Sequence, residues 1–361
     1  MKNTFGNMLS VTIFGESHGA AVGAVLDGLP SGIEVDEEYI KERLSLRRPS
    51  GAVSTGRAEP DEFIIESGVY RGKTTGTPLC IVIPNTCQRS GDYESLQNKP
   101  RPSHADFAAH IRYGGFEDPR GGGHFSGRIT AALVAAGAIV LPELKRQGVE
   151  IGCHIKRCAG IEDRGFEDFG EDFKKLSTAA FGVLDDNKKA QMIERIKQAK
   201  AETDSVGGIL ETAVIGMPKG VGEPWFDSVE SVLAHALFSI PAVKGVEFGS
   251  GFGFADMKGS EANDAFMFEN GEVKTKTNHN GGINGGITNG MEILFSCAVK
   301  PTPSIGKEQA TVDLKSMQNT TIKVGGRHDP CIVHRARPVV ESVAALALYD
   351  CLLTGGKAGC R

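Results

Sequence analysis

The sequence predicts a mixed fold of helices and strands, with sheets on the outside and apolar helices on the inside. Residues 126–143 and the segment that starts at Arg337 are apolar on nearly every face. A helix of that kind must be covered by other layers on all sides. Strand-like segments flank short turns elsewhere, and an internal repeat indicates two similar halves. Two halves that each bury one apolar helix would place their sheets outside.

The N-terminal part of the chain is expected to supply several strands and one helix. Residues 9–14 and 22–27 are predicted strands on either side of a Gly-Glu-Ser-His-Gly turn. A helix is predicted over residues 36–48, because acidic residues occupy its first turn and arginines its last. Residues 62–83 are again predicted to be rich in strands.

Further helices follow. Ser103, with Asp106 three residues later, resembles a capping box and predicts a short helix that ends near Tyr113. Residues 126–143 form the first apolar helix, and residues 187–201 are predicted to form a charged, exposed one. The second apolar helix is expected to start at Arg337, with Pro338 in its first turn.

The internal repeat appears when the chain is shifted by 188 positions. In both copies a strand-like stretch leads to Gly-[Leu/Met]-Pro-x-Gly and then to a helix, at 36–48 and 227–239. Five identities between common turn residues leave chance as the alternative. No linker divides the chain, so we expect one domain over residues 1–361 with halves of roughly 1–185 and 186–361. The matching residues are Ser205, Gly207, Gly216, Pro218 and Gly220, which fall on Ser17, Gly19, Gly28, Pro30 and Gly32.

Composition excludes several classes of protein. The 361 residues carry a net charge of −5, which does not favour binding to nucleic acid or to an anionic membrane. The longest apolar run falls short of a bilayer span, and the first residues lack signal-peptide architecture. None of the eight cysteines lies in a Cys-x-x-Cys pair, so we expect reduced thiols, no structural zinc and a cytoplasmic location.

The turn at Gly15–Gly19 raises a question of function. It satisfies Gly-x-Ser-x-Gly, the pattern of a hydrolase nucleophile elbow, which would make Ser17 the nucleophile. An elbow needs a helix directly after the serine, and the following residues are too rich in glycine to form one. The alternative is that His18 transfers protons, because the imidazole pKa lies near working pH.

Histidines and arginines gather in loop-like stretches. His18, His104, His279, His328 and His334 lie beside Gly, Pro or Arg. Proton transfer fits them better than metal binding, for which the His328–His334 spacing is only a loose match. Asp329 is a possible base.

Arginine clusters at 47–57, at Arg101 and at 327–337 favour a pocket for a small phosphorylated polyacid, because guanidinium groups clamp carboxylates and phosphates. Surface charge is the alternative for some of them, Arg335 included. Residues 121–128 precede a predicted buried helix, whose N-terminus could hold an anion.

The chain resembles the chorismate synthase family along essentially its whole length. The match is specific because many blocks occur in order: FGESHG, DGLPSG, RRPSG, TTGTP, NTCQRSGDY, RPSHAD, GGG before SGRITAA, DSVGG, AHALFSIPAVKGVEFG, NHNGGINGGI, KPTPSI and GRHDPC.

The resemblance implies an α+β sandwich, with central helices between two antiparallel sheets, and a homotetramer. It also implies conversion of 5-enolpyruvylshikimate 3-phosphate to chorismate and phosphate by 1,4-anti elimination. That reaction needs reduced FMN without net redox change. NAD(P)H would act only indirectly, and a chain of this compact type depends on a separate flavin reductase or another reductant.

The resemblance also implies roles for single residues. His18 would protonate the departing phosphate, His104 would protonate or balance the reduced flavin, and Asp329 would assist proton removal at flavin N5. The positions that match substrate binding are Ser17, Arg47, Arg48, Arg101, Arg128 and Arg327. The positions that match flavin binding are His124, Phe125, Ser126, Pro241, Ala242, Gly285, Lys300, Pro301, Thr302, Pro303, Ser304 and Arg327.

The chain departs from the family pattern at the residues after its three glycines. The family commonly has Arg-Ser there, and this chain has His124 and Phe125. Either His124 replaces the arginine at the flavin or Phe125 packs on the flavin ring. Two further hypotheses stay open: a serine hydrolase that uses Ser17, and a polyacid-binding relative that has lost its chemistry.

Overall fold

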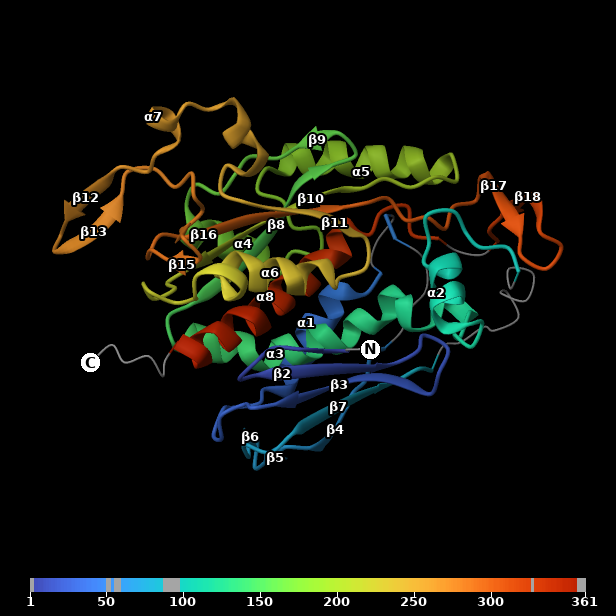
Figure 1. Ribbon diagram of the computed structural model, residues 1–361, viewed down its shortest axis with the longest axis horizontal. Coiled ribbons are helices and arrows are strands. Elements are labelled where there is room, and N and C mark those ends of the chain that lie inside the picture. The colour runs from blue at the N-terminus through green and yellow to red at the C-terminus, as the bar shows by residue number, and fades with distance from the viewer. Residues whose placement is uncertain (1–2, 50–52, 55–59, 87–97, 326–327, 356–361) are drawn as a thin grey trace.

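Two five-stranded antiparallel sheets enclose a layer of helices (Figure 1). The computed structural model describes residues 3–49, 53–54, 60–86, 98–325 and 328–355. The strand order is β1-β2-β3-β7-β4 in the first sheet and β11-β16-β10-β8-β9 in the second. The predicted α+β sandwich with central helices is therefore confirmed.

The predicted strands 9–14 and 22–27 are confirmed as the hairpin β2–β3, and β4 to β7 fall within or close to the predicted region 62–83. The first sheet contains β1 (Thr4–Phe5), β2 (Ser10–Gly15), β3 (Ala21–Asp27), β7 (Leu79–Pro84) and β4 (Ile64–Ser67). The second contains β11 (Val243–Phe248), β16 (Ile293–Val299), β10 (Gly208–Ile215), β8 (Glu150–Cys158) and β9 (Ile161–Glu162). Two-stranded ribbons are β5 (Val69–Tyr70) with β6 (Lys73–Thr74), β12 (Phe266–Glu269) with β13 (Glu272–Thr275), β14 (Ile283–Asn284) with β15 (Ile287–Thr288), and β17 (Glu308–Asp313) with β18 (Gln318–Lys323).

Four helices pack against one another between the sheets. They are α1 (Glu37–Arg47), α3 (Thr130–Arg146), α6 (Val229–Phe238) and α8 (Val333–Gly355). The other helices are α2 (Asp106–Tyr113), α4 (Phe169–Ser177), α5 (Asp186–Ala201) and α7 (Gly259–Ala262). Short 3₁₀ turns are η2 (Arg120–Phe125), η3 (Gly127–Ile129), η4 (Trp225–Asp227) and η5 (Gly251–Asp256).

Helices α3 and α8 form the centre of the molecule. Both are long and apolar enough to cross a bilayer, but most of each apolar stretch is buried inside the protein, as expected for core helices. They cross closely at Gly137, where an added Cβ would lie 2.3 Å from Ser342 Cβ. The C-terminal turn of α3 also lies near Tyr349 of α8. The two helices therefore run parallel, with their N-termini at the same end.

The two halves share one topology. Each runs strand, strand, helix, strand, strand, helix, and the sheet orders β2-β3-β7-β4 and β8-β10-β16-β11 correspond. A threonine locks the repeated Gly-x-Pro-x-Gly loop in both copies. The Thr74 hydroxyl donates to Pro30 O (2.6 Å) and the Thr288 hydroxyl donates to Pro218 O (2.6 Å). The second run of strands and helices begins at β8. The expected division of the chain at residue 185 remains a prediction.

Two helix starts differ from expectation. Ala105, rather than Ser103, is the N-cap of α2, and it makes no side-chain cap bond. The Asp106 carboxylate instead binds Arg101 and His104, so no capping box forms. Helix α8 begins at Val333, so Pro338 lies inside the helix and not in its first turn.

A buried histidine joins β8 to β10 in the second sheet. His154 is fully buried, with Nδ1 3.3 Å from Asp163 and Nε2 2.8 Å from Glu211. Burial alone would lower the pKa of His154, but the hydrogen bonds to the two carboxylates outweigh burial and raise it. This histidine is structural.

Candidate active site

The Gly15–Gly19 segment is the connection of the β2–β3 hairpin, and it holds two buried polar side chains. Ser17 and His18 are each 4% exposed. Ser17 Oγ lies 3.2 Å from the Arg120 carbonyl, which can only accept, so the serine donates its one hydrogen there. His18 Nδ1, 3.1 Å from the same Oγ, is then the donor. Since Nδ1 is committed to Ser17, Nε2 is the His18 nitrogen that is left to give or accept a proton.

This geometry excludes a nucleophile elbow. After Gly19 the chain enters β3, which pairs antiparallel with β2, and not a helix. The serine hydrolase hypothesis is therefore wrong in its structural premise. Ser17 shapes the turn and sets the tautomer of His18.

Three glycines in η2 bring two histidines together. Gly121, Gly122 and Gly123 all have positive φ angles (61°, 87° and 52°). A Cβ on Gly121 would lie 2.2 Å from His18 Cε1, and a Cβ on Gly122 would lie 3.1 Å from His104 Cε1. Both imidazoles thus pack against neighbouring residues of one loop, at a distance that only glycine allows.

His104 is oriented by a carboxylate. Its Nδ1 lies 2.6 Å from Asp106 Oδ1 and 3.1 Å from Arg101 Nη2. One ring nitrogen cannot donate and accept at once, and the shorter contact to a carboxylate requires Nδ1–H as the donor. Burial opposes ionisation of Asp106, but its bonds from Arg101 and His104 hold its pKa well below the usual value. His104, like His18, therefore presents Nε2 as its reactive nitrogen.

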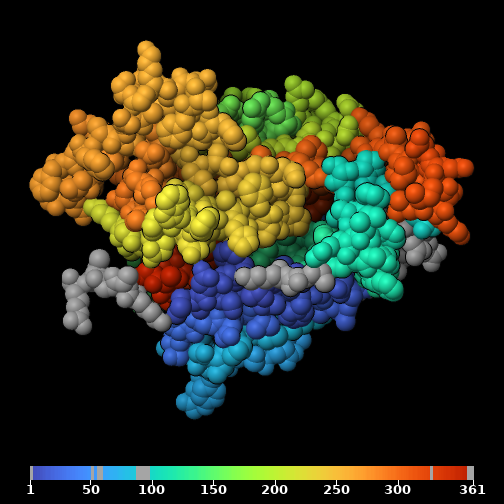
Figure 2. All heavy atoms as spheres, in the orientation of Figure 1, coloured from blue at the N-terminus to red at the C-terminus, as the bar shows by residue number. Residues whose placement is uncertain are grey.

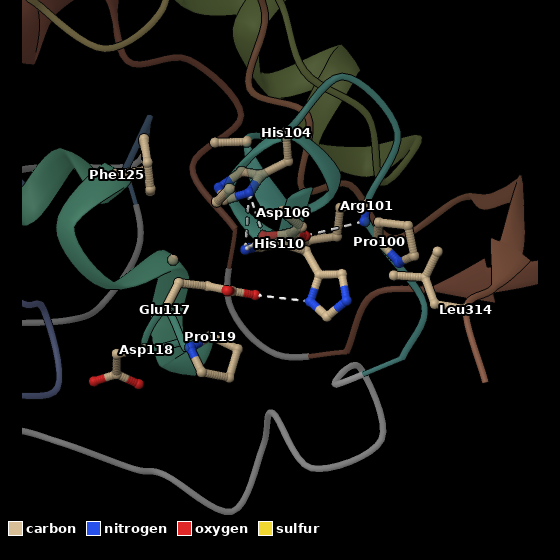
Figure 3. Close-up of a pocket in the computed structure, with 13 residues that line it drawn as sticks. Pro100, Arg101, His104, Asp106, His110, Glu117, Asp118, Pro119, Phe125 and Leu314 are labelled. Carbon is tan, nitrogen blue, oxygen red and sulfur yellow. Dashed lines mark hydrogen bonds and ion pairs between the residues drawn. The ribbon is translucent and has the colours of Figure 1, made fainter. Parts of the chain in front are cut away.

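A pocket lies beside His104, and Figure 3 shows Arg101, Asp106 and Phe125 around it. Phe125 is 39% exposed, and its ring lies 6.2 Å from that of Tyr113. An aromatic face at the pocket wall suits a planar ligand. On a larger scale, Figure 2 shows the surface hollowed between α2 and the segment of α6 and β11.

The carboxylate of one buried aspartate forms ion pairs with several arginines of this region. Asp61 is 2% exposed, and its Oδ2 lies 3.0 Å from Arg47 Nη2 and 3.7 Å from Arg48 Nε. Its Oδ1 pairs with Arg128 Nη1. Burial would raise the pKa of Asp61, and the arginines outweigh it and lower the pKa. Arg47 Nε has no hydrogen-bond partner among the described residues, which fits a site for an added anion.

The Asp329 carboxylate pairs with Arg335. Arg335 also donates from Nε to the Arg47 carbonyl at 2.8 Å, so its expected role as surface charge is wrong. Its guanidinium instead ties the start of α8 to the end of α1. The Thr302 hydroxyl donates to the Asp329 carbonyl at 2.8 Å, which fixes this backbone from the other side.

The segment of residues 300–304 docks on the segment that carries His104. Lys300 Nζ donates to Ser103 Oγ (2.9 Å), and Arg101 Nη1 donates to Ser304 Oγ (3.1 Å). Pro301 and Pro303 lie between these contacts in the chain. Burial and Lys244 lower the pKa of Lys300.

Residues 241 and 242 adjoin this segment. Lys300 N donates to the Ala242 carbonyl, next to Pro241, and Ala242 has a φ of 75°, which is strained for a residue with a Cβ. At the entrance to α3, the Ser126 hydroxyl accepts from Arg128 N as the cap of η3.

One predicted cofactor residue, Gly285, is not brought here. Gly285 lies in the β14–β15 turn, where Val229 N donates to Gly286 O (3.0 Å). That hairpin adjoins the start of β16, whereas Lys300 follows its end (Figure 1). Its cofactor role stays a prediction. Arg327 lies outside the described residues.

The parallel helices α3 and α8 both begin at this site, so both positive helix ends face it. Two imidazole Nε2 atoms, several arginines and two helix N-termini lie together here, a set of groups suited to an anionic ligand and to proton transfer. The molecule is thus an α+β sandwich with a candidate acid–base site at the N-terminal ends of its central helices.

The comparisons with known proteins identify the family. The chorismate synthase family model matches residues 9–353. Proteins named chorismate synthase from Thermococcus kodakarensis and Chitinophaga pinensis are 46% and 47% identical, over 96% and 97% of this chain and 97% and 96% of their own lengths. A crystal structure of chorismate synthase aligns with a TM-score of 0.76 and 28% identity, covering 97% of this chain and 93% of that one. The chain belongs to the chorismate synthase family and is an enzyme.

Two residues of the site were not predicted from the sequence. Asp61 and Asp106 orient the arginines and His104; Asp61 was assigned no role, and Asp106 was predicted only as part of a capping box. Asp106 could have been found, because it stands two residues after a candidate histidine. For Asp61 the sequence offers no sign, since a carboxylate between distant arginines depends on tertiary contacts.

Proposed function

We propose that the protein converts 5-enolpyruvylshikimate 3-phosphate to chorismate and phosphate by 1,4-anti elimination. The observation that carries this proposal is the packing of His18 and His104 against Gly121 and Gly122, with Nε2 as the reactive atom of each ring. A substrate with one phosphate and two carboxylates suits the surrounding arginines.

The residues present fit an anionic flavin cofactor. Lys300 offers a positive charge, and Phe125 offers an aromatic face in the wall of the pocket beside His104. Reduced FMN, when bound, supplies transient electron donation that activates a C–H bond too weakly acidic for a simple base. NAD(P)H takes part only by reducing flavin elsewhere. The matching flavin positions include Ser126, Pro241, Ala242, Gly285, Pro301, Thr302, Pro303, Ser304 and Arg327.

The chain's own groups hold and move the protons. His18, with Nδ1–H committed to Ser17, gives the proton on Nε2 to the departing phosphate. His104, with Nδ1–H committed to Asp106, holds a proton on Nε2 and so balances negative charge in the bound cofactor. The Asp329 carboxylate, held beside Arg335, would assist proton removal at flavin N5.

One anaerobic assay tests the proposal. Purified protein is mixed with dithionite-reduced FMN and enolpyruvylshikimate phosphate, and chorismate absorbance is followed. We expect turnover, and roughly 10²- to 10⁴-fold less turnover in each of His18→Ala and His104→Ala. Saturable substrate binding without product would instead identify a binder that has lost the chemistry.

Two further aspects of the proposal concern the cell. We place the protein in the cytoplasm, as a homotetramer that depends on a separate reductase for FMN. Exposed aromatic side chains occur around η4, η5 and β12, where Trp225, Phe252 and Phe268 are 84%, 83% and 76% exposed. Exposed large aromatic side chains of this kind support a subunit interface. A steady rate with NADPH and oxidised FMN as the only reductant source would contradict the need for a reductase.

A further inference from the structure

His124 connects two loops of the candidate site. Its Nδ1 lies 2.7 Å from the carbonyl oxygen of Gly15, the last residue of β2. A carbonyl oxygen only accepts, so Nδ1 carries the hydrogen and donates it. Gly15, with φ 99°, opens the turn that holds Ser17 and His18.

Other contacts join the same two loops. Ser17 N donates to Gly123 O at 3.1 Å, Ser17 Oγ donates to Arg120 O at 3.2 Å, and Gly121 packs against the His18 ring. In this set the 120–125 loop contributes backbone atoms, except for the side chain of His124. The His124 bond is therefore a side-chain contact that fixes where the His18 turn begins.

We propose that His124 is a positioning residue that holds the Gly15–Gly19 turn, and through it His18. The inference rests on the proposed function only where it assigns His18 a proton to transfer. A flavin contact from this side chain would have to use Nε2, because Nδ1–H is already bound to Gly15 O. Small displacements of a proton donor from its acceptor reduce rates strongly, so a loosened turn lowers turnover more than substrate affinity.

The test compares three substitutions. In His124→Asn the side-chain amide can place its NH₂ close to the position of Nδ1 and keep the bond to Gly15 O. In His124→Gln the amide lies one carbon further out, and in His124→Ala the donor is lost. We expect kcat within about 3-fold of wild type for Asn, and a fall of roughly 10- to 10²-fold for Ala, with KM for substrate nearly unchanged. His124→Gln should fall between them.

A second readout does not depend on activity. Amide hydrogen exchange is measured by mass spectrometry on the peptide that covers the Gly15–Gly19 turn. The turn should exchange faster in His124→Ala and at the wild-type rate in His124→Asn, while the peptide of β16 stays unchanged. His235→Ala, which removes an exposed histidine on α6, is the matched control and should leave the turn unchanged.

The flavin alternative predicts a different pattern. If His124→Ala weakens FMN binding about 10-fold or more, leaves exchange in the turn unchanged, and regains wild-type kcat at saturating FMN, the positioning role is wrong. If His124→Ala does not fold, the contrast between Asn and Gln decides in the same way. Absence of chorismate with the wild-type protein would contradict the proposed function, while the exchange experiment would still test His124.

Discussion

Asp61→Asn tests whether the arginines of the site depend on one buried carboxylate. Asp61 is 2% exposed and pairs with Arg47 and Arg128, which are 5% and 9% exposed. The amide keeps the shape of the side chain but removes its charge, which leaves two buried guanidinium groups facing each other. Removing one partner of a buried pair costs about 3–5 kcal/mol.

The expected change in melting temperature follows from the size of the chain. An unfolding entropy of about 2.1 cal/mol/K per residue near 60 °C gives roughly 0.76 kcal/mol/K for this length. The loss of about 3–5 kcal/mol then lowers the melting temperature by roughly 4–7 °C. Scanning calorimetry measures it, with Glu62→Gln, an exposed acid next in the chain, as a control that should change stability by about 0.5 kcal/mol or less.

Added anion and pH sharpen this test. Inorganic phosphate should raise the melting temperature of Asp61→Asn more than that of wild type, because it replaces the lost negative charge between the arginines.

The pKa of Asp61 is lowered in the folded protein. The stability that its carboxylate contributes is therefore present above the unfolded pKa of about 3.9 and is lost as pH falls through the folded pKa. The gap between wild type and variant should therefore close in acid. A variant that melts within about 1 °C of wild type at neutral pH would refute the reasoning.

Three other substitutions test single features. Gly121→Ala forces a Cβ into the His18 ring at a positive φ, so chorismate formation should fall at least 10²-fold, roughly the worth of one positioned acid, and retained activity would show that the loop can shift. Asp106→Asn removes the negative charge that fixes Nδ1–H of His104 and lets an amide NH₂ face that nitrogen; kcat should fall roughly 10- to 10²-fold with little change in KM, and an equal rise in KM would contradict the assignment. His154→Gln should cost about 2 kcal/mol in urea unfolding at pH 6. Because the pKa of His154 is raised, that stabilisation is present below about pH 6.5 and is lost as pH rises through the folded pKa, so a difference that grows with pH would be inconsistent.

The fold was largely predictable because burial leaves a strong trace in sequence. The apolar helices α3 and α8 are buried on all sides, as their composition requires. The hairpin β2–β3 was predictable from two apolar runs around a glycine-rich turn. Helix starts were less predictable: Ser103 and Asp106 have the spacing of a capping box, but the ion pair of Asp106 with Arg101 takes the carboxylate.

The candidate site was predictable in its residue types and less so in its connections. His18 and His104 stand in distinctive motifs, and the structure brings both to the three-glycine turn. The tautomer of His18 depends on the bond from Ser17 to the Arg120 carbonyl, and that of His104 depends on Asp106. Arg120 is far from His18 in the chain, so no sequence spacing predicts the first of these contacts. Arg335 was expected at the surface because charge favours exposure, and only the tertiary fold shows that Asp329 draws it inward.

The duplicated topology contains two similar serine turns, and only the one in the first half carries a histidine. In the first half Ser17 N donates to Gly123 O, ahead of α3, and in the second Val206 N donates to Pro330 O, ahead of α8. Both serines also donate to a carbonyl: Ser17 to Arg120, and Ser205 to Thr302 at 2.8 Å. The serine is thus common to both turns, and in each turn its hydroxyl donates to a backbone carbonyl. At the next position the halves differ, with His18 in one and Val206 in the other. The repeat therefore places a single imidazole from this position at the candidate site, and the second half adds Asp329, whose neighbour Pro330 accepts the backbone bond from Val206.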